Sequence, residues 1–382
     1  MENSIYLDHN ATTPPLPEVI TAVFDAMGLI GANPSSIHAN GRAARILVDD
    51  ARDSVAALVG AEPEEVVFTS GGSESNNTVI MCAGLRRILV SPTEHAAVLK
   101  TVLTRSPSSV LIPVDHDGLV DLQELEAILA DDHEPALVCV MAANNETGVL
   151  QPMADISELA HRYGAYVHCD AVQAVGKIPV DIKAWGVDYL ALSAHKMGGP
   201  QGVGALVRRD NAQLNSFITG GGQEHGVRAG TENVAAISGL GIAAQIAAET
   251  LDEKYTTLMA YRDALEIGIK ALSPATTIFC EDAPRLPNTS NFTLPGVSSG
   301  KQIMALDLAG VFVSAGSACS AGKVDPSHVL ESMDVDPELS TTALRTSFGW
   351  SSEVADVDRF LDAWGDLVYR EVCEVVKETS AV

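Results

Sequence analysis

Apolar residues follow two alternating spacings in the central part of the chain. Between Ala44 and Leu58 they recur every three or four positions, which predicts an amphipathic helix. Short runs of almost wholly apolar residues follow, each bounded by polar residues or glycine and separated by segments long enough for helices. They lie at 65–69, 88–91, 137–141, 166–169 and 189–192. Buried strands that alternate with helices are typical of a mostly parallel sheet covered on both faces, so we predict an α/β fold.

The pattern changes after about residue 251. A helix-like run extends to residue 269, and strand-like pieces follow near 277–280, 289–294 and 311–314. From 354 to 375 apolar residues again step by three or four, which predicts a final helix. We therefore predict a large domain over residues 16–255 and a smaller α+β domain formed by residues 1–15 and 256–382.

Composition and charge narrow the classes of function. The chain has 382 residues, and its 24 Lys and Arg against 50 Asp and Glu give a net charge of −26. That charge argues against a broad nucleic-acid surface and against docking on an anionic membrane. The first residues lack a basic and apolar leader, and we find no apolar run of about 18 residues, so neither a secretory signal nor a membrane span is expected. The six cysteines are dispersed without a C-x-x-C pair, which argues against disulfides and zinc and favours a cytoplasmic protein.

A turn rich in glycine and serine, Thr69-Ser-Gly-Gly-Ser-Glu-Ser75, lies between a predicted buried strand and a predicted helix. Glycines let a ligand approach the backbone, and the first turn of a helix offers free N–H groups and a positive dipole end. This turn could therefore hold a phosphate. An ordinary strand-to-helix turn with a serine cap fits the same residues equally well.

Two further segments place reactive side chains at the ends of predicted strands. Asp170 ends one strand at the edge where α/β sheets bind ligands, although a lone carboxylate there is more often a helix cap. Ser193, His195 and Lys196 end another strand, where a single lysine is usually a side chain that reaches solvent. Together, a turn for a phosphate, a carboxylate for a protonated ring nitrogen and a lysine for a Schiff base match the chemistry of pyridoxal phosphate.

Cys319 differs from the other cysteines. Cysteines 82, 139, 169, 280 and 373 lie in apolar or strand-like surroundings and are expected to be small core residues. Cys319 lies in a run of glycine, serine and alanine, where we expect an accessible loop that suits a reactive thiol. A cysteine that simply fills a tight turn is the alternative.

These segments, with several others, resemble the cysteine desulfurases of the NifS/IscS type in the class V aminotransferase superfamily. The resemblance rests on short motifs whose order and spacing extend over nearly the whole chain. They are Tyr6-Leu-Asp-His-Asn-Ala-Thr-Thr-Pro14, Asn33-Pro-Ser-Ser-Ile-His38, Thr93-Glu-His-Ala-Ala-Val98, Asn144-Asn-Glu-Thr-Gly148, Ser193-Ala-His-Lys196, Gly220-Gly-Gly-Gln-Glu224, Arg228-Ala-Gly-Thr231, Gly316-Ser-Ala-Cys319 and Leu344-Arg-Thr-Ser347. The resemblance implies the type I fold of pyridoxal-phosphate-dependent transferases, with a mostly parallel seven-stranded sheet.

The resemblance also implies roles around the cofactor, pyridoxal 5'-phosphate. Lys196 would hold the cofactor and shuttle the substrate's Cα proton, and Asp170 would pair with the ring nitrogen. His95 would stack on the ring and act as a catalytic residue by helping proton transfer. Gln173 would hydrogen-bond the phenolic oxygen of the ring. The phosphate would be held by Gly72, Ser73, Ser193 and His195, and by Thr231 from the second subunit of a homodimer.

The implied reaction converts L-cysteine to L-alanine and leaves the sulfur on Cys319 as a persulfide. Asn145 and Arg345 would bind the substrate carboxylate, and Asn145 would also contact the cofactor. The persulfide would pass to acceptor proteins, such as an iron–sulfur scaffold, for cluster assembly or thiolation, with no metal in the site itself. The run from Gly316 to His328 indicates the group with the longer cysteine loop. Two alternatives stay open: selenocysteine lyase or another class V enzyme, and a non-catalytic scaffold on the same fold.

Overall fold

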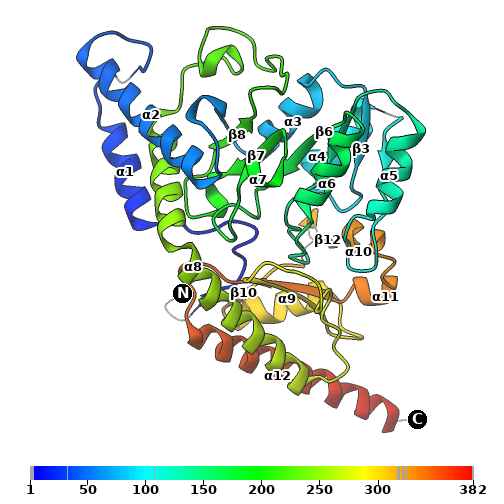
Figure 1. Ribbon diagram of the computed structural model, residues 1–382. Helices are drawn as coiled ribbons and strands as arrows, with labels where there is room; N and C mark the ends of the chain where they lie inside the picture. Colours follow the sequence, from blue (N-terminus) through cyan, green and yellow to red (C-terminus); the bar gives the residue numbers. More distant parts are fainter. Residues whose placement is uncertain are drawn as a thin grey trace.

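The computed structural model describes residues 4–31, 33–106, 108–315, 319–320, 323–324 and 326–380, the last nine of these and 319–320 and 323–324 by their backbone only. A sheet of seven strands forms its centre (Figure 1). In spatial order these strands are β2 (Val66–Thr69), β8 (Gly204–Arg208), β7 (Tyr189–Ser193), β6 (Tyr166–Asp170), β5 (Ala136–Cys139), β3 (Arg87–Val90) and β4 (Val110–Leu111). Only β8 runs antiparallel to its neighbours, so the predicted mostly parallel α/β sheet is confirmed.

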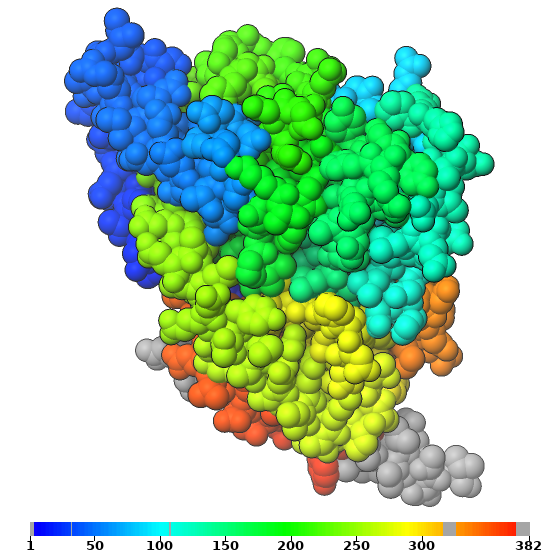
Figure 2. Space-filling model, viewed as in Figure 1, coloured from blue at the N-terminus to red at the C-terminus, as the bar shows by residue number. Residues whose placement is uncertain are grey.

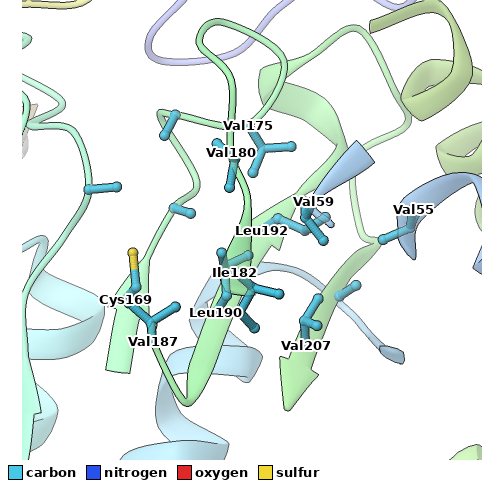
Figure 3. Close-up of a cluster of buried hydrophobic side chains, with 14 of the residues drawn as sticks. Val55, Val59, Cys169, Val175, Val180, Ile182, Val187, Leu190, Leu192 and Val207 are labelled. Carbon is cyan, nitrogen blue, oxygen red and sulfur yellow. The ribbon is translucent and has the colours of Figure 1, made fainter. Parts of the chain in front are cut away.

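Helices cover both faces of this sheet because successive strand residues point to opposite sides. In β3, Leu89 packs into one buried apolar cluster, while Ile88 and Val90 pack into another. The first cluster lies beneath α1 (Pro17–Met27), α2 (Ala39–Leu58), α5 (Leu122–Asp131), α6 (Met153–Arg162), α7 (Ile182–Trp185) and α8 (Val234–Leu272). Figure 3 shows a part of it between β7, β8 and the end of α2. The second lies beneath α3 (Gly72–Cys82) and α4 (Ala96–Arg105).

A third apolar cluster lies below the sheet, where the C-terminal elements pack in the space-filling view (Figure 2). It joins the N-terminal residues Ile5 and Leu7 to the end of α8 and to the side chains of Phe292 and Trp364. Its elements are β1 (Ile5–Tyr6) paired with β10 (Val311–Phe312), β9 (Thr289–Thr293) paired with β13 (Ala343–Ser347), α9 (Ser299–Leu308) and α12 (Val354–Ser380). The short elements α10 (His328–Ser332) and α11 (Pro337–Ser340), and β11 (Cys319–Ser320) paired with β12 (Lys323–Val324), complete this part.

Helix α8 connects the two parts without interruption. It contributes Leu240 and Ala243 to the cluster under the sheet, and Leu265 and Ile269 to the C-terminal cluster. The boundary predicted at 255/256 therefore lies inside a continuous helix, and the division into domains stays a prediction. The first half of α8 is apolar enough by composition to cross a membrane, which the sequence analysis did not detect, but half of that stretch is buried against the rest of the protein. Its packing against α1 and α2 is that of a core helix.

The strand predicted near 277–280 is the main local difference. Ile278 makes only an isolated bridge to Phe292, and Cys280 has a φ of 56°, which a strand does not accommodate. The other predicted strands and the final helix agree with the elements observed, to within a few residues at their ends.

Candidate active site

Three of the predicted segments meet at one edge of the sheet. Asp170 is the last residue of β6, and Ser193 is the last residue of β7. Lys196 follows β7 in a single 3₁₀ turn, Ala194–Lys196. Thr69 at the end of β2 pairs with Gly204 of β8, which pairs in turn with Ser193. The topology therefore brings the Gly/Ser turn after β2 beside the lysine, although more than 120 residues separate them in the chain.

A cavity of about 520 Å³ opens at this edge, and four of the five residues predicted to hold a phosphate line it. They are Gly72, Ser73, Ser193 and His195. Helix α3 begins at Gly72 without a side-chain cap, because the preceding Gly71, with a φ of 149°, has no side chain to provide one. Free N–H groups of the first turn and hydroxyl groups are donors suited to a phosphate, so the cavity fits the phosphate end of pyridoxal phosphate.

A carboxylate also lies on this wall. Glu74 lines the cavity, accepts a hydrogen bond from the Ser70 N–H at 2.8 Å, and pairs with Arg228, whose Nε lies 3.0 Å from Glu74 Oε1. Loss of water around Glu74 opposes its ionisation, but the bonds from Arg228 and Ser70 prevail and its pKa is lowered. Arg228 thus balances the negative charge that Glu74 places beside a phosphate site.

The backbone packs closely behind the Gly/Ser turn, and this packing allows a test of the phosphate site. A Cβ atom on Gly204 would lie 2.5 Å from the Leu192 carbonyl oxygen and 2.8 Å from Gly71 Cα. We expect Gly204→Ala to lower the free energy of unfolding by about 2 kcal/mol, because backbone must move to admit the methyl group. The affinity for pyridoxal phosphate should fall as well, because Gly71 adjoins the phosphate site. Thermal denaturation measures the stability, and equilibrium binding of pyridoxal phosphate measures the affinity. The matched variant Gly300→Ala in α9, where no atom lies within 4 Å of the new Cβ, should lower neither stability nor affinity, because alanine is the better helix former; equal stability and affinity in the two variants would contradict this account.

Asp170 is held in a fixed position at the other end of the site. It is 4% exposed and accepts hydrogen bonds from Asn76 Nδ2 at 2.7 Å and from the Val172 N–H at 3.0 Å. Asn76 Oδ1 faces His168 Nε2 at 2.9 Å, so His168 donates and thereby turns the Asn76 amide group toward Asp170. Burial lowers the pKa of His168 to about 3, and this imidazole is neutral. A buried carboxylate anchored in this way can accept a hydrogen bond from a protonated ring nitrogen.

Lys196 is partly buried, and its Nζ donates to the carbonyl oxygens of Asn10 at 2.5 Å and Ala11 at 2.8 Å. Burial, with a smaller contribution from the positive charge of Arg345, lowers the pKa of Lys196 to about 8, while Asp8 and Asp170 oppose the shift. At pH 7 about a tenth of this amine is therefore uncharged, far more than for an ordinary lysine, and the uncharged form is the one that a nucleophilic lysine requires.

This shift predicts how the rate of cofactor attachment to the apoprotein depends on pH. Only the neutral amine reacts, so the rate should rise about tenfold per pH unit below pH 8 and level off above it. The Arg345→Gln variant lacks the charge that helps to lower the pKa of Lys196. The pH at which its rate levels off, the break in the pH–rate profile, should therefore be higher. Stopped-flow absorbance measures both, and the free cofactor ionises identically in the two experiments. The same break in both proteins would contradict the assignment.

The pKa shift of Lys196 also bears on stability. Between pH 8 and about 10.5 the unfolded chain binds a proton at Lys196 that the folded chain has lost. The contribution of Lys196 therefore makes the unfolding free energy of the apoprotein rise with pH across this window.

The predicted substrate-binding pair is brought together at β13. Arg345 is buried, its Nη2 lies 2.6 Å from Asp8 Oδ1, and its Nη1 donates to the Asn145 carbonyl oxygen at 2.8 Å. Its Nε is buried and makes no hydrogen bond in the described part of the chain. A guanidinium with a donor to spare, close enough to Lys196 to influence its pKa, fits a carboxylate ligand beside the lysine.

His95 forms the N-cap of α4, where its Nδ1 accepts a hydrogen bond from the Ala97 N–H at 3.1 Å. This bond places the proton of the neutral ring on Nε2. The ring keeps contact with solvent, yet loss of water around it lowers its pKa, with Lys196 and His328 adding to the effect and Asp170 opposing it. The effect of both charges on its pKa places His95 close to Asp170 and Lys196.

The described contacts do not join two of the predicted residues, Thr231 and Cys319, to this site. Thr231 is exposed and is not among the residues that line it, so its role across a subunit interface stays a prediction. Cys319 pairs with Val324 in the small β11–β12 ladder, but its side chain lies outside the described residues. Residues 316–318, 321–322 and 325 of the predicted loop from 316 to 328 also lie outside them, and the side chains of this loop are described only from 326 onward.

The sequence analysis did not assign a role to Asn10, although this residue lies in one of the motifs that carry the resemblance. The Asn10 carbonyl oxygen accepts from both Lys196 Nζ and Gln173 Nε2, the latter at 2.9 Å. Its side chain bonds Thr289 at 2.9 Å and Lys177 at 2.8 Å. Glu94 was also missed: it is buried beside Asp170, and burial with that negative charge raises its pKa well above the usual range. Nothing in the local pattern marks either residue, because both act through contacts distant in sequence.

The donor set fits an organic cofactor. Over residues 4–380, apart from the gaps named above, no three His, Cys, Asp or Glu side chains gather as metal ligands would. The absence of a metal stays a prediction. The N-terminus of α3, the anchored carboxylate and the partly neutral lysine match in turn the phosphate, the ring nitrogen and the aldehyde of pyridoxal phosphate.

Comparison with known proteins agrees with this site. The sequence model of the aminotransferase class-V family matches residues 5–360 of this chain. A cysteine desulfurase of Cereibacter sphaeroides is 42% identical over 374 residues, which cover 95% of each chain. An IscS-like cysteine desulfurase of Mycobacterium tuberculosis is 40% identical, with 96% of each chain covered. The cysteine desulfurase NifS of Azotobacter vinelandii is 37% identical over 98% of this chain and 93% of its own.

Solved structures agree as well. A NifS-like protein of Rickettsia africae superimposes with a TM-score of 0.89 at 36% identity, covering 96% of this chain and all of that one. A structure described as SspA in complex with cysteine gives a TM-score of 0.78 at 30% identity, covering 91% of this chain and 99% of that one. The chain therefore belongs to the class-V aminotransferase family and, within it, to the pyridoxal-phosphate-dependent cysteine desulfurases.

Proposed function

We propose that this protein removes the sulfur atom of L-cysteine, releases L-alanine and carries the sulfur as a persulfide on Cys319. One observation carries the proposal most directly. Segments distant in the chain place a partly neutral lysine, an anchored carboxylate and a phosphate cradle at one sheet edge, with Arg345 beside the lysine. The relatives named above are cysteine desulfurases, and the SspA structure contains cysteine.

Pyridoxal phosphate supplies an electron sink that makes the Cα proton of a bound amino acid acidic. The residues of this chain do the rest. The N-terminus of α3 and the hydroxyl groups of Ser73 and Ser193 bind the phosphate. Asp170 accepts the hydrogen bond of the ring nitrogen and keeps that nitrogen protonated. Arg345 orients the substrate through its carboxylate, and Lys196 takes the Cα proton on Nζ and returns it.

The sulfur step balances without an added oxidant. The thiolate of Cys319 attacks the sulfur of the substrate, the Cβ–S bond breaks, and its electron pair with a proton becomes the methyl group of alanine. One cysteine and one thiol thus give one alanine and one persulfide. An acceptor protein with a thiolate can then take the outer sulfur and regenerate Cys319. We place this transfer in iron–sulfur cluster assembly or thiolation, in the cytoplasm.

A homodimer belongs to the same proposal. The exposed position of Thr231, outside the cavity of its own chain, leaves it available to reach the phosphate of a second copy. Analytical ultracentrifugation, together with complementation between a Thr231 variant and a Lys196 variant, tests this arrangement.

Incubation of the purified holoprotein with L-cysteine and a reducing thiol tests the proposed function. We expect equal amounts of alanine and sulfide, and a persulfide on Cys319 when the reductant is omitted. Faster turnover of L-selenocysteine, with no persulfide on the protein, would favour a selenocysteine lyase. A protein that binds the cofactor and transforms neither amino acid would be a scaffold on this fold.

A further inference from the structure

A second lysine, Lys177, lies beside the site and takes no part in the reaction described above. It is 8% exposed, and its Nζ lies 2.6 Å from Gln173 Oε1 and 2.8 Å from Asn10 Oδ1. No carboxylate among the described residues forms an ion pair with it. Burial, with the positive charges of Lys196 and Arg345, lowers the pKa of Lys177 well below its usual range. Two hydrogens of this amine are thus accepted by two amide oxygens.

The orientation of the Gln173 amide follows from its two neighbours. One end of the amide lies 2.9 Å from the Asn10 carbonyl oxygen, which can only accept, so that end is Nε2. The other end, Oε1, therefore faces Lys177. Nε2 uses one hydrogen for Asn10, and its second hydrogen makes no further bond among the described residues. The Asn10 carbonyl oxygen also accepts from Lys196 Nζ, so this free N–H lies next to the reactive lysine.

The Asn10 side chain is oriented in the same way. Its Nδ2 donates to the Asn145 carbonyl oxygen at 3.3 Å and to Thr289 Oγ1 at 2.9 Å, so its Oδ1 faces the other direction. There Oδ1 accepts from Lys177 Nζ and from Asn288 Nδ2 at 3.2 Å. Two amide oxygens from different segments thus converge on one buried amine. Without that amine they would lie close together with too few donors, which is costly in a buried place.

We propose that Lys177 is a positioning residue: its buried amine joins Gln173 Oε1 to Asn10 Oδ1, keeps the Gln173 Nε2 hydrogen turned toward the cofactor, and holds the Asn10 carbonyl that Lys196 contacts. If the amine is removed, Gln173 Oε1 loses its donor, while the Asn10 carbonyl oxygen still requires Nε2 on its side. The amide is then held at one end only, and its free N–H is no longer fixed in the direction of the cofactor. The inference rests on the proposed cofactor site and adds a residue to it.

Two measurements on the Lys177→Met variant, which keeps most of the unbranched apolar side chain and removes the donor, test this role. We expect the dissociation constant of pyridoxal phosphate for the apoprotein to rise about three- to tenfold, the value of one hydrogen bond. We also expect the visible absorption band of the bound cofactor to shift in the same direction as in Gln173→Met. Adding Lys177→Met to Gln173→Met should change the dissociation constant by less than about twofold, since the amide it orients is gone.

Lys254→Met is the matched control, since Lys254 is a partly buried lysine on α8 without a contact to the site. It should bind the cofactor as the unmodified protein does. Lys177→Gln, which keeps an N–H donor on a side chain one atom shorter than lysine, should give a smaller change in the same direction. Affinity and spectrum equal to those of the unmodified protein, in whichever Lys177 variant folds, would overturn the proposal. So would full additivity with Gln173→Met. Failure of the unmodified protein to bind the cofactor would instead refute the proposed site.

Discussion

Replacement of Lys196 by alanine is expected to abolish covalent attachment of pyridoxal phosphate and to lower alanine formation from cysteine by about 10²–10⁴-fold or more. The variant loses both the nucleophilic amine and the group that moves the Cα proton. Borohydride reduction followed by denaturation measures attachment, because the cofactor then stays on the protein only if it was covalently bound. Alanine release measures the chemical step.

The Lys196→Ala protein should fold and still bind the cofactor non-covalently. Lys196 Nζ donates two hydrogen bonds to main-chain oxygens, which stabilise the folded protein. Its lowered pKa destabilises the folded protein near neutral pH, so the two contributions to the free energy of unfolding partly cancel. Phosphate donors and Asp170 are unchanged in this variant. Lys254→Ala on α8 controls for the loss of a partly buried lysine and should behave as the unmodified protein does. Cofactor retained after denaturation of reduced Lys196→Ala would show that another lysine is the site of attachment.

Replacement of Cys319 by serine is expected to lower sulfide and alanine production by about 10³-fold, which corresponds to about 4 kcal/mol of lost transition-state stabilisation. Serine is close in size but is a poor nucleophile toward sulfur, so the Cβ–S bond of the substrate stays intact. The affinity for pyridoxal phosphate should not change. Mass spectrometry of the protein after cysteine addition shows whether a persulfide forms.

Cys82→Ser provides the matched thiol control. Cys82 is a partly buried cysteine whose thiol has a pKa raised by burial, with Arg105 opposing the shift, so it is unsuited to act as a thiolate. This variant should keep full activity. If Cys319→Ser continues to form alanine and sulfide at the original rate, the protein uses a class V reaction that needs no cysteine, and the desulfurase mechanism proposed here is wrong.

The wider charge distribution agrees with a site for small anions in an acidic protein. The net charge of −26 is carried by the whole chain, whereas Arg345, Lys196 and His195 gather at one sheet edge. Burial, followed by the charges of Lys196 and Lys177, lowers the pKa of His195 to about 4, so this ring acts there as a neutral hydrogen-bonding group. The excess of acidic residues therefore excludes a broad polyanion surface without excluding a phosphate or a carboxylate.

Sequence patterns predicted the strand ends well and the long-range contacts poorly. Asp170 and Ser193 each follow an uninterrupted apolar run, and such a run marks a buried strand before any tertiary contact is known. The beginning of α8 at Val234 was missed because its first half is rich in alanine and glycine and shows no clear apolar stripe. The strand predicted near 277–280 was wrong because the left-handed backbone at Cys280 depends on its tertiary setting.

The sequence alone determined which residues end the buried strands. Through its motifs it also determined the family and the cofactor, and it singled out Lys196 and Asp170 as candidate residues for binding that cofactor. These properties depend on local apolar patterns and on residue order, which one chain displays without folding. Only the tertiary structure decided that Asn10 joins Lys196 to Gln173, that His168 orients Asn76 toward Asp170, and that Lys177 is buried among amide oxygens. Each of these depends on which polar atoms face one another once water is excluded. Hydrogen-bond partners and pKa values are set by the neighbours that folding brings together.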